Sequence, residues 1–261
     1  MANVTGVLKS RVLSPLKHKV LVPAGEVVGR VVLERKVQNT PVDPAIHYPC
    51  YKSFDDLINV ERLKSLDTYV TSKIEEHKKE RDDIFYSGFL TLKANSPKRA
   101  GSRIINLSRR KTARGGYLDL DKADLWAISD EANEFPLLMD FIATLPFKTT
   151  ARMMIMYDSG GHVVTPHRDH SVTDLCHEFL WFRTNLNKPF YMLNPKNGEK
   201  RYVQSYSAWF DSVNQFHGAD AYDGMSFSIR VDGTFTDEFR KRIPVPKCNP
   251  ASAPALWACN S

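Results

Sequence analysis

The sequence has little of what marks a secreted or membrane protein. Its four cysteines are scattered and form no C-x-x-C pair, so we expect neither a disulfide framework nor a zinc ribbon. These cysteines are Cys50, Cys176, Cys248 and Cys259. No run approaches the roughly 20 apolar residues that cross a bilayer. The first residues also lack the basic and then apolar segments of a secretory signal. We therefore expect a cytoplasmic protein without a membrane partner.

The composition is that of a globular domain with an uneven distribution of charge. Of 261 residues, 42% are hydrophobic and 25% are charged, which suits a single domain over 1–261. The net charge is +6, and the stretch from Lys93 to Arg114 is rich in lysine and arginine without an acidic residue. Such a run can bind phosphates or other anions. It contains no aromatic residue, and Pro97, Gly101 and the following Gly115 and Gly116 are typical of loops, so we favour a solvated loop.

Hydrophobic periodicity predicts strands and supporting helices over 1–150. The stretch 20–33 is rich in Val and Leu around a turn, which indicates short strands. Apolar residues recur every three or four positions from Leu63 to Ile74. They predict a helix that starts at a Ser53 cap and packs against a sheet. A second helix is expected over 130–143, interrupted by Pro136.

The segment 151–232 has a different character, in which short β-like runs alternate with turn signals. The runs are 153–157, 178–185, 189–193, 201–203, 207–213 and 225–231. Several short strands at this spacing favour a sandwich or barrel. We predict a mainly β fold with flanking helices, a double-stranded β-helix of the jelly-roll, cupin-like kind. Residues 233–261 are expected to form a helical turn and a proline-rich tail.

The main chemical signal is a pair of ligand-type residues two positions apart. In His167-Arg-Asp169 the two ends point to the same side of an extended strand, so both can bind one ion. The segment Phe216-His217-Gly218 lies far enough along the chain to return with a third ligand. Two histidines and one carboxylate leave three positions of an octahedron open, as in non-haem iron(II) oxygenases. We predict His167, Asp169 and His217 as the metal ligands and the catalytic centre.

Such an iron site needs a reducing cosubstrate beside O2. 2-Oxoglutarate would take two of the open positions through its keto acid end, and its far carboxylate then needs a buried cation. Ser228 and Arg230 share one face of a predicted strand, and arginine can hold a carboxylate with two parallel hydrogen bonds. The predicted cofactors are therefore Fe(II), 2-oxoglutarate and O2, with Arg230 and Ser228 in the cosubstrate pocket.

These motifs resemble a known family. Residues 151–232 look like the catalytic core of 2-oxoglutarate/Fe(II)-dependent oxygenases, in particular the aspartyl/asparaginyl β-hydroxylase-like and proline hydroxylase-like branch. The matching stretches are 153–161, 167–169, 209–218 and 228–232. The resemblance implies hydroxylation of an unactivated C–H bond in an amino acid, free or in a peptide. Related halogenases lack a carboxylate at the Asp169 position, so its presence favours hydroxylation.

The chain departs from this branch at one point. An Arg-x-His pair often follows H-x-D in the branch, whereas the corresponding stretch here contains Trp181, Arg183 and Asn185 on one face. Trp181 and Arg183 become further candidates for the cosubstrate pocket. For Arg183, contact with substrate, contact with cosubstrate and a surface ion pair all remain open.

Three alternatives stay open beside the leading prediction. The basic stretch is compatible with the same chemistry on a nucleic acid or another anionic substrate, although this is not favoured. A cupin-like protein that binds a metal or ligand without turnover would carry the same three residues. A zinc hydrolase is less favoured, because it would need a general base that the sequence does not identify. Substrate, oligomeric state and the metal bound on purification are not fixed by the motif.

Overall fold

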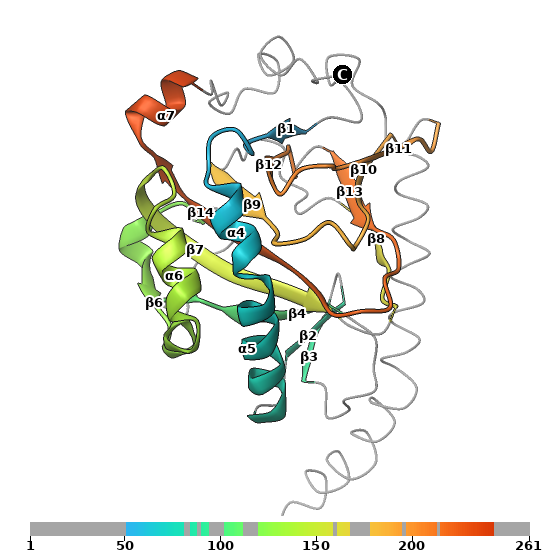
Figure 1. The fold of residues 1–261 in the computed structure, drawn as a ribbon, viewed down its shortest axis with the longest axis horizontal. Coiled ribbons are helices and arrows are strands. Elements are labelled where there is room, and N and C mark those ends of the chain that lie inside the picture. Colours follow the sequence, from blue (N-terminus) through green and yellow to red (C-terminus); the bar gives the residue numbers. More distant parts are fainter. Residues whose placement is uncertain are drawn as a thin grey trace, which may run out of the picture.

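The structure is a computed structural model that describes residues 51–80, 84–87, 90–93, 102–111, 120–158, 161–167, 178–194, 197–212 and 215–242. The predicted strands within 20–33 and the proline-rich tail lie outside the described residues. The described strands form one sheet of eight strands, one of four and one of two (Figure 1).

The last eight strands wind between the two larger sheets. They are β7 (Phe147–Asp158), β8 (Val164–His167), β9 (Phe179–Phe182), β10 (Phe190–Leu193), β11 (Lys200–Tyr202), β12 (Ser207–Trp209), β13 (Phe216–Ala219) and β14 (Ser226–Phe235). They pair antiparallel as β7 with β14, β8 with β13, β9 with β12 and β10 with β11. This is one long hairpin, and β9–β14 and β10–β13 pairing wraps it into a barrel. The predicted double-stranded β-helix, or jelly roll, is confirmed by this topology.

Strands from the N-terminal half extend the large sheet. In this sheet β1 (Lys52–Ser53) pairs with β12, while β4 (Ser102–Asn106), β2 (Ile84–Ser87) and β3 (Leu90–Lys93) follow β7 in that order. A separate pair consists of β5 (Ser108–Arg110) and β6 (Trp126–Ile128). The expectation of a solvated loop over 93–114 was wrong for 102–110. This segment forms strands, and Arg103 in β4 is only 4% exposed.

The helices differ from the prediction at their ends. They are α4 (Val60–Ser65), α5 (Asp67–Glu80), α6 (Pro136–Ile142) and α7 (Asp237–Arg242), with 3-10 helices η4 (Ala123–Leu125) and η5 (Asp130–Glu134). Ser53 is not a helix cap, because it lies in β1. Asn59 is the cap, and its side chain accepts a hydrogen bond from the Arg62 N–H. Pro136 begins α6 instead of interrupting it, in keeping with its fixed φ. No described helix is long and apolar enough to cross a membrane.

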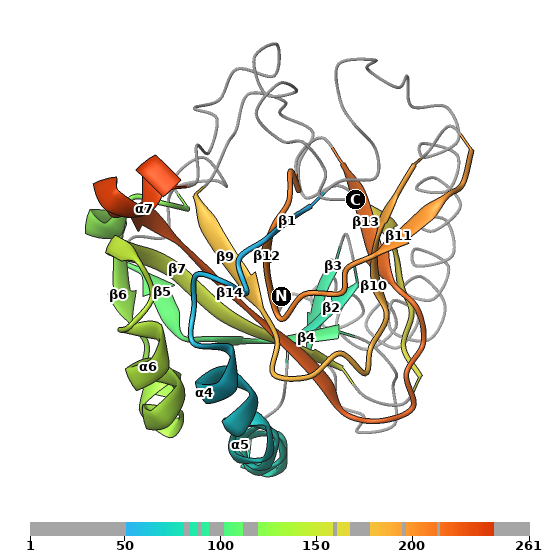
Figure 2. The same cartoon turned by 45° about the horizontal axis from the view of Figure 1, so that its top comes forward.

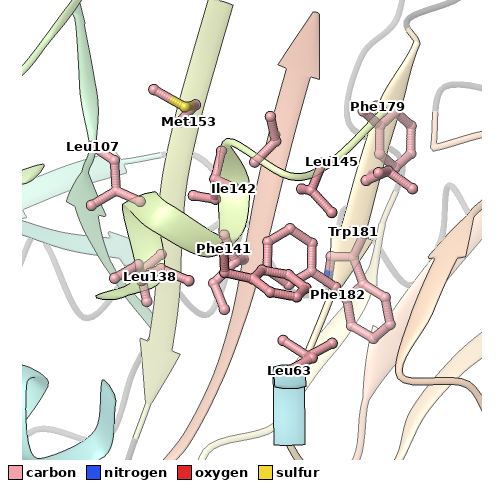
Figure 3. Packing of buried hydrophobic residues seen from close by; sticks show 14 of the residues in the cluster. Leu63, Leu107, Leu138, Phe141, Ile142, Leu145, Met153, Phe179, Trp181 and Phe182 are labelled. Carbon is pink, nitrogen blue, oxygen red and sulfur yellow. The ribbon is translucent and has the colours of Figure 1, made fainter. Parts of the chain in front are cut away.

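Helices α4, α5 and α6 lie on one face of the large, eight-stranded sheet, and the four-stranded sheet lies on its other face (Figure 2). The predicted apolar positions Leu63, Leu66, Val70 and Ile74 are all buried. On α6, Phe141 packs edge-on against Phe182 of β9 with ring centroids 5.7 Å apart (Figure 3). The helix layer therefore covers the outer face of the large sheet and leaves its inner face to line the barrel.

Asp55 ties the start of the described chain to the barrel. Its carboxylate accepts hydrogen bonds from the backbone N–H groups of Tyr206 at 3.0 Å and Ser207 at 2.7 Å. The backbone N–H of Phe54 donates to the Ser207 carbonyl at 2.9 Å. These contacts hold the segment before β12 in place.

Replacing Asp55 should therefore destabilise the barrel. We expect Asp55→Ala to lower the free energy of unfolding by about 1–3 kcal/mol, because two backbone N–H groups lose their acceptor. The matched control is Asp56→Ala, since Asp56 is exposed; it should change stability by less than about 0.5 kcal/mol. Denaturant unfolding measures both variants. Equal effects would contradict the role given to Asp55.

Candidate metal centre

Two of the three predicted ligands face each other across neighbouring strands. His167 at the end of β8 and His217 in β13 are register partners, and their ring centroids lie 4.5 Å apart. His217 is 5% exposed, and His167 is half-buried. The antiparallel pairing of β8 and β13 thus brings together two imidazoles that are distant in the sequence.

Hydrogen bonds fix which ring nitrogen of each histidine can bind a metal. The Nδ1 atom lies 2.8 Å from the Thr165 carbonyl oxygen in His167 and 3.2 Å from the Gln215 carbonyl oxygen in His217. A carbonyl only accepts, so Nδ1 carries the proton in each ring, and the neutral ring has its lone pair on Nε2. Histidine ligands of metals commonly donate their second N–H to such a carbonyl. Both rings are therefore held in a tautomer suited to metal binding.

The third predicted ligand, Asp169, lies outside the described residues. It follows the last residue of β8 by two positions. Within the described part of the chain, no group of three His, Cys, Asp or Glu side chains is placed to hold a metal. The two histidines are the described part of the predicted triad, and the carboxylate stays a prediction from the sequence.

Gly218 permits the close packing of the strands around His217. A Cβ atom added at Gly218 would lie 2.6 Å from the Val164 carbonyl oxygen and 2.7 Å from the Tyr191 hydroxyl. Val164 belongs to β8 and Tyr191 to β10, so β13 packs closely against both neighbouring strands at this residue. A backbone carbonyl cannot move aside as a flexible side chain can.

A side chain at position 218 should disturb the histidine pair. We expect Gly218→Ala to cost about 1–3 kcal/mol of stability, because the added methyl pushes β13 away from β8. It should also weaken Co(II) binding by spreading the two rings. Gly198→Ala is the control, because a Cβ there meets nothing within 4 Å. An alanine at this position would be strained only by the positive φ of 74°, not by a neighbouring atom. Calorimetric titration with Co(II) and thermal unfolding check both. Unchanged metal affinity in Gly218→Ala would count against this geometry.

Aromatic side chains wall the barrel interior beside His217. The ring centroids of Phe210 and Phe190 lie 5.1 Å and 5.9 Å from that of His217. Trp181 stacks on Phe190 at 4.6 Å and is buried. Trp181 was predicted to lie in the cosubstrate pocket, and its place in this wall is compatible with that role. The wall makes the surroundings of His217 apolar.

Arg230 lies on the inner face in a buried charge cluster. It is the register partner of Trp181, and its guanidinium carbon is 3.9 Å from the centroid of the Phe179 ring. Its Nη2 donates to Asp232 Oδ1 at 2.9 Å, and its Nη1 lies 3.4 Å from the Ser212 hydroxyl. Ser228 lies two residues earlier in β14 and therefore on the same face. The predicted cation is thus buried, and Asp232 holds it in one orientation.

A second arginine shares the same carboxylate. Arg152 of β7 donates from Nε to Asp232 Oδ2 at 2.8 Å. Burial acts to raise the pKa of Asp232, but Arg152 and Arg230 outweigh it and hold the pKa below its usual value. Asp232 is fully buried as an anion between two guanidinium groups.

Arg183, for which contact with substrate, contact with cosubstrate and a surface ion pair were left open, is buried and donates to backbone carbonyls. Its Nη1 donates to the Lys188 carbonyl at 2.9 Å and its Nε to the Ser205 carbonyl at 3.2 Å, and its Nη2 donates to the Val203 carbonyl. Burial lowers its pKa to about 10, although Asp55 opposes this. These bonds give Arg183 a structural role in holding the chain before β12. The predicted contact with a cosubstrate or substrate has no support from them.

Sequence reasoning overlooked the partners of Arg230. No role was assigned to Asp232, although it lies in the Ser228-Ile-Arg230-Val-Asp232 stretch, and no role was assigned to Arg152. The available signal was alternation, because residues 228, 230 and 232 share a strand face. Arg152 is likewise a charged residue between the apolar Ala151 and Met153, and such a residue in a strand needs a partner.

Comparisons with known proteins find only distant structural similarity. No protein-family model and no curated protein sequence matches the chain. Solved structures that resemble it include a Pseudomonas putida prolyl-4-hydroxylase, with 10% identity, a TM-score of 0.40 and coverage of 78% of this chain and 97% of that one. A Trichoplax adhaerens prolyl hydroxylase in complex with a hypoxia inducible factor peptide fragment has 9% identity, a TM-score of 0.42 and coverage of 86% and 96%.

A third structure, an oxidoreductase of the 2OG-Fe(II) oxygenase family from Burkholderia pseudomallei, has 9% identity, a TM-score of 0.34 and coverage of 72% and 93%. Similarity this distant leaves the activity of the present chain to be argued from its own residues.

Proposed function

We propose that the chain is a non-haem Fe(II)/2-oxoglutarate-dependent dioxygenase that hydroxylates an amino acid, free or in a peptide, at an unactivated C–H bond. The observation that carries this proposal is the His167–His217 pair on β8 and β13 of a jelly roll, with ring centroids 4.5 Å apart. Asp169 follows His167 by two residues and would supply the carboxylate.

The donor set of this site fits Fe(II). Two imidazoles with their lone pairs on Nε2 and one carboxylate form the ligand group typical of Fe(II) sites with open positions. When bound, iron with 2-oxoglutarate and O2 supplies the oxidising power for C–H hydroxylation and yields succinate and carbon dioxide. His167, Asp169 and His217 would hold the metal. The chain itself contributes binding, orientation and the exclusion of water.

Arg230 and the aromatic wall support the cosubstrate part of the proposal. Arg230 is buried on the inner face and contacts the Phe179 ring. Phe179 packs against Phe210 with ring centroids 5.6 Å apart, and Phe210 in turn contacts His217. In this arrangement Arg230 would bind the far carboxylate of 2-oxoglutarate, and Ser228 would lie beside it. The aromatic rings keep water away from the metal and strengthen each charged contact there.

The substrate class rests on the sequence resemblance to the β-hydroxylase-like and proline hydroxylase-like branch. The nucleic-acid alternative was based on the basic stretch 93–114, whose charges would have to be exposed to bind phosphates. Part of that stretch is strand, and Arg103 is buried in it. A protein that binds the metal without turnover would have the same site residues. Only an experiment distinguishes this alternative from the proposed enzyme.

An anaerobic titration tests the proposed function. Fe(II) and 2-oxoglutarate added to the metal-free protein should give the weak visible charge-transfer band of the iron chelate. The variants His167→Ala, Asp169→Ala and His217→Ala should each lose this band and succinate formation, because each removes a ligand. His162→Ala, in the segment before β8, is the matched control and should keep the band. A full band in any of the three variants would remove that residue from the site.

Turnover separates the enzyme from a metal-binding protein. With O2, the wild-type protein should release succinate, and the rate should rise with the right amino acid or peptide. Iron binding without any succinate release over a broad amino acid and peptide set would favour the non-catalytic alternative.

A further inference from the structure

Among the residues that the structure describes, Arg152, Asp232 and Arg230 form a buried cluster with one more positive charge than negative charge. Asp232 is 0% exposed, and the side chains of Arg230 and Arg152 are 6% and 13% exposed. Arg152 donates to Oδ2 of Asp232, whereas Nη2 of Arg230 donates to Oδ1. Nε of Arg230 lies 3.1 Å from Oδ1 and 3.2 Å from Oδ2, so both arginines bind the same carboxylate.

The backbone is shaped to bring Arg152 into this cluster. Val231 pairs with Met153 and Gly233 with Thr150, so β7 contains one extra residue opposite Asp232. This is a β-bulge, which commonly redirects a side chain at a site. A Cβ at Gly233 would lie only 2.2 Å from the Thr149 carbonyl oxygen, so the two strands approach closely beside the bulge. The position of Arg152 therefore depends on a specific local irregularity.

We propose that Arg152 is a positioning residue that neutralises Asp232, so that Arg230 keeps a net positive charge for the far carboxylate of 2-oxoglutarate. This inference rests on the proposed function. Asp232 alone would orient Arg230 but also cancel its charge, and a neutral pair attracts an anion poorly in an apolar interior. With Arg152 present, Asp232 fixes the Nε and Nη2 edge of Arg230 while the cluster stays cationic.

The charge assignment makes a prediction that a packing role would not make. Arg152→Met should raise the dissociation constant of 2-oxoglutarate in the anaerobic Fe(II) complex by about tenfold, since it removes the excess charge. The double variant Arg152→Met/Asp232→Asn restores one net positive charge and should recover most of the affinity. Arg152→Lys keeps the charge and should stay close to wild type. Lys148→Met removes an exposed charge from the same strand and is the matched control.

A second ligand distinguishes the far carboxylate from the metal. 2-Oxopentanoate has the same carbon chain and keto acid end but lacks the far carboxylate, so its affinity should be unchanged by Arg152→Met. Equal weakening of both ligands, or no recovery in the double variant, would overturn the role of Arg152. A wild-type protein that binds neither ligand would overturn the proposed function itself.

If Arg152→Met does not fold, the other two Arg152 variants replace it as the test. A wild-type affinity for 2-oxoglutarate in Arg152→Lys, together with recovery in the double variant, then supports the inference. A loss of affinity in either variant overturns it.

Discussion

The candidate site depends on one constraint, the antiparallel register of β8 with β13. Because side chains alternate along a strand, a slip of one residue would turn His217 away from His167 and out of the barrel. Gly218 allows the close approach of β8, β13 and β10 that this register requires. The carbonyls of Thr165 and Gln215 then orient the two rings. Strand pairing thus brings the imidazoles together, and a carbonyl two residues earlier in each segment sets which nitrogen each ring presents.

The rest of the fold keeps this register in place. The wound hairpin links β8–β13 to β7–β14 on one side and to β9–β12 on the other, so the pairs support one another. Helices α4 to α6 cover the outer face of the large sheet, and Asp55 and Arg183 hold the segment before β12. The inner face is left for aromatic rings and for charges that pair with one another.

The sequence predicts the part of this structure that depends on local patterns. Short runs with turn signals located most of the strands of the jelly roll, and periodicity located the apolar face from Leu63 to Ile74. Helix starts were less accurate, because Ser53 joins a strand through pairing with a distant segment. Pairing with distant segments also explains why the strands in 102–110 were not predicted. The three carbonyls around Arg183 were missed for the same reason. Long-range partners also decide the charge cluster, so Arg152 could not be linked to Asp232 from the sequence.

We propose that His167 and His217 bind one metal ion together with a carboxylate. X-ray absorption spectroscopy of the anaerobically iron-loaded protein tests it most directly. We predict one iron per chain, with two imidazole nitrogens and otherwise oxygen ligands, and one imidazole fewer in His217→Ala. Sulfur ligands, or the same coordination in wild type and His217→Ala, would contradict it.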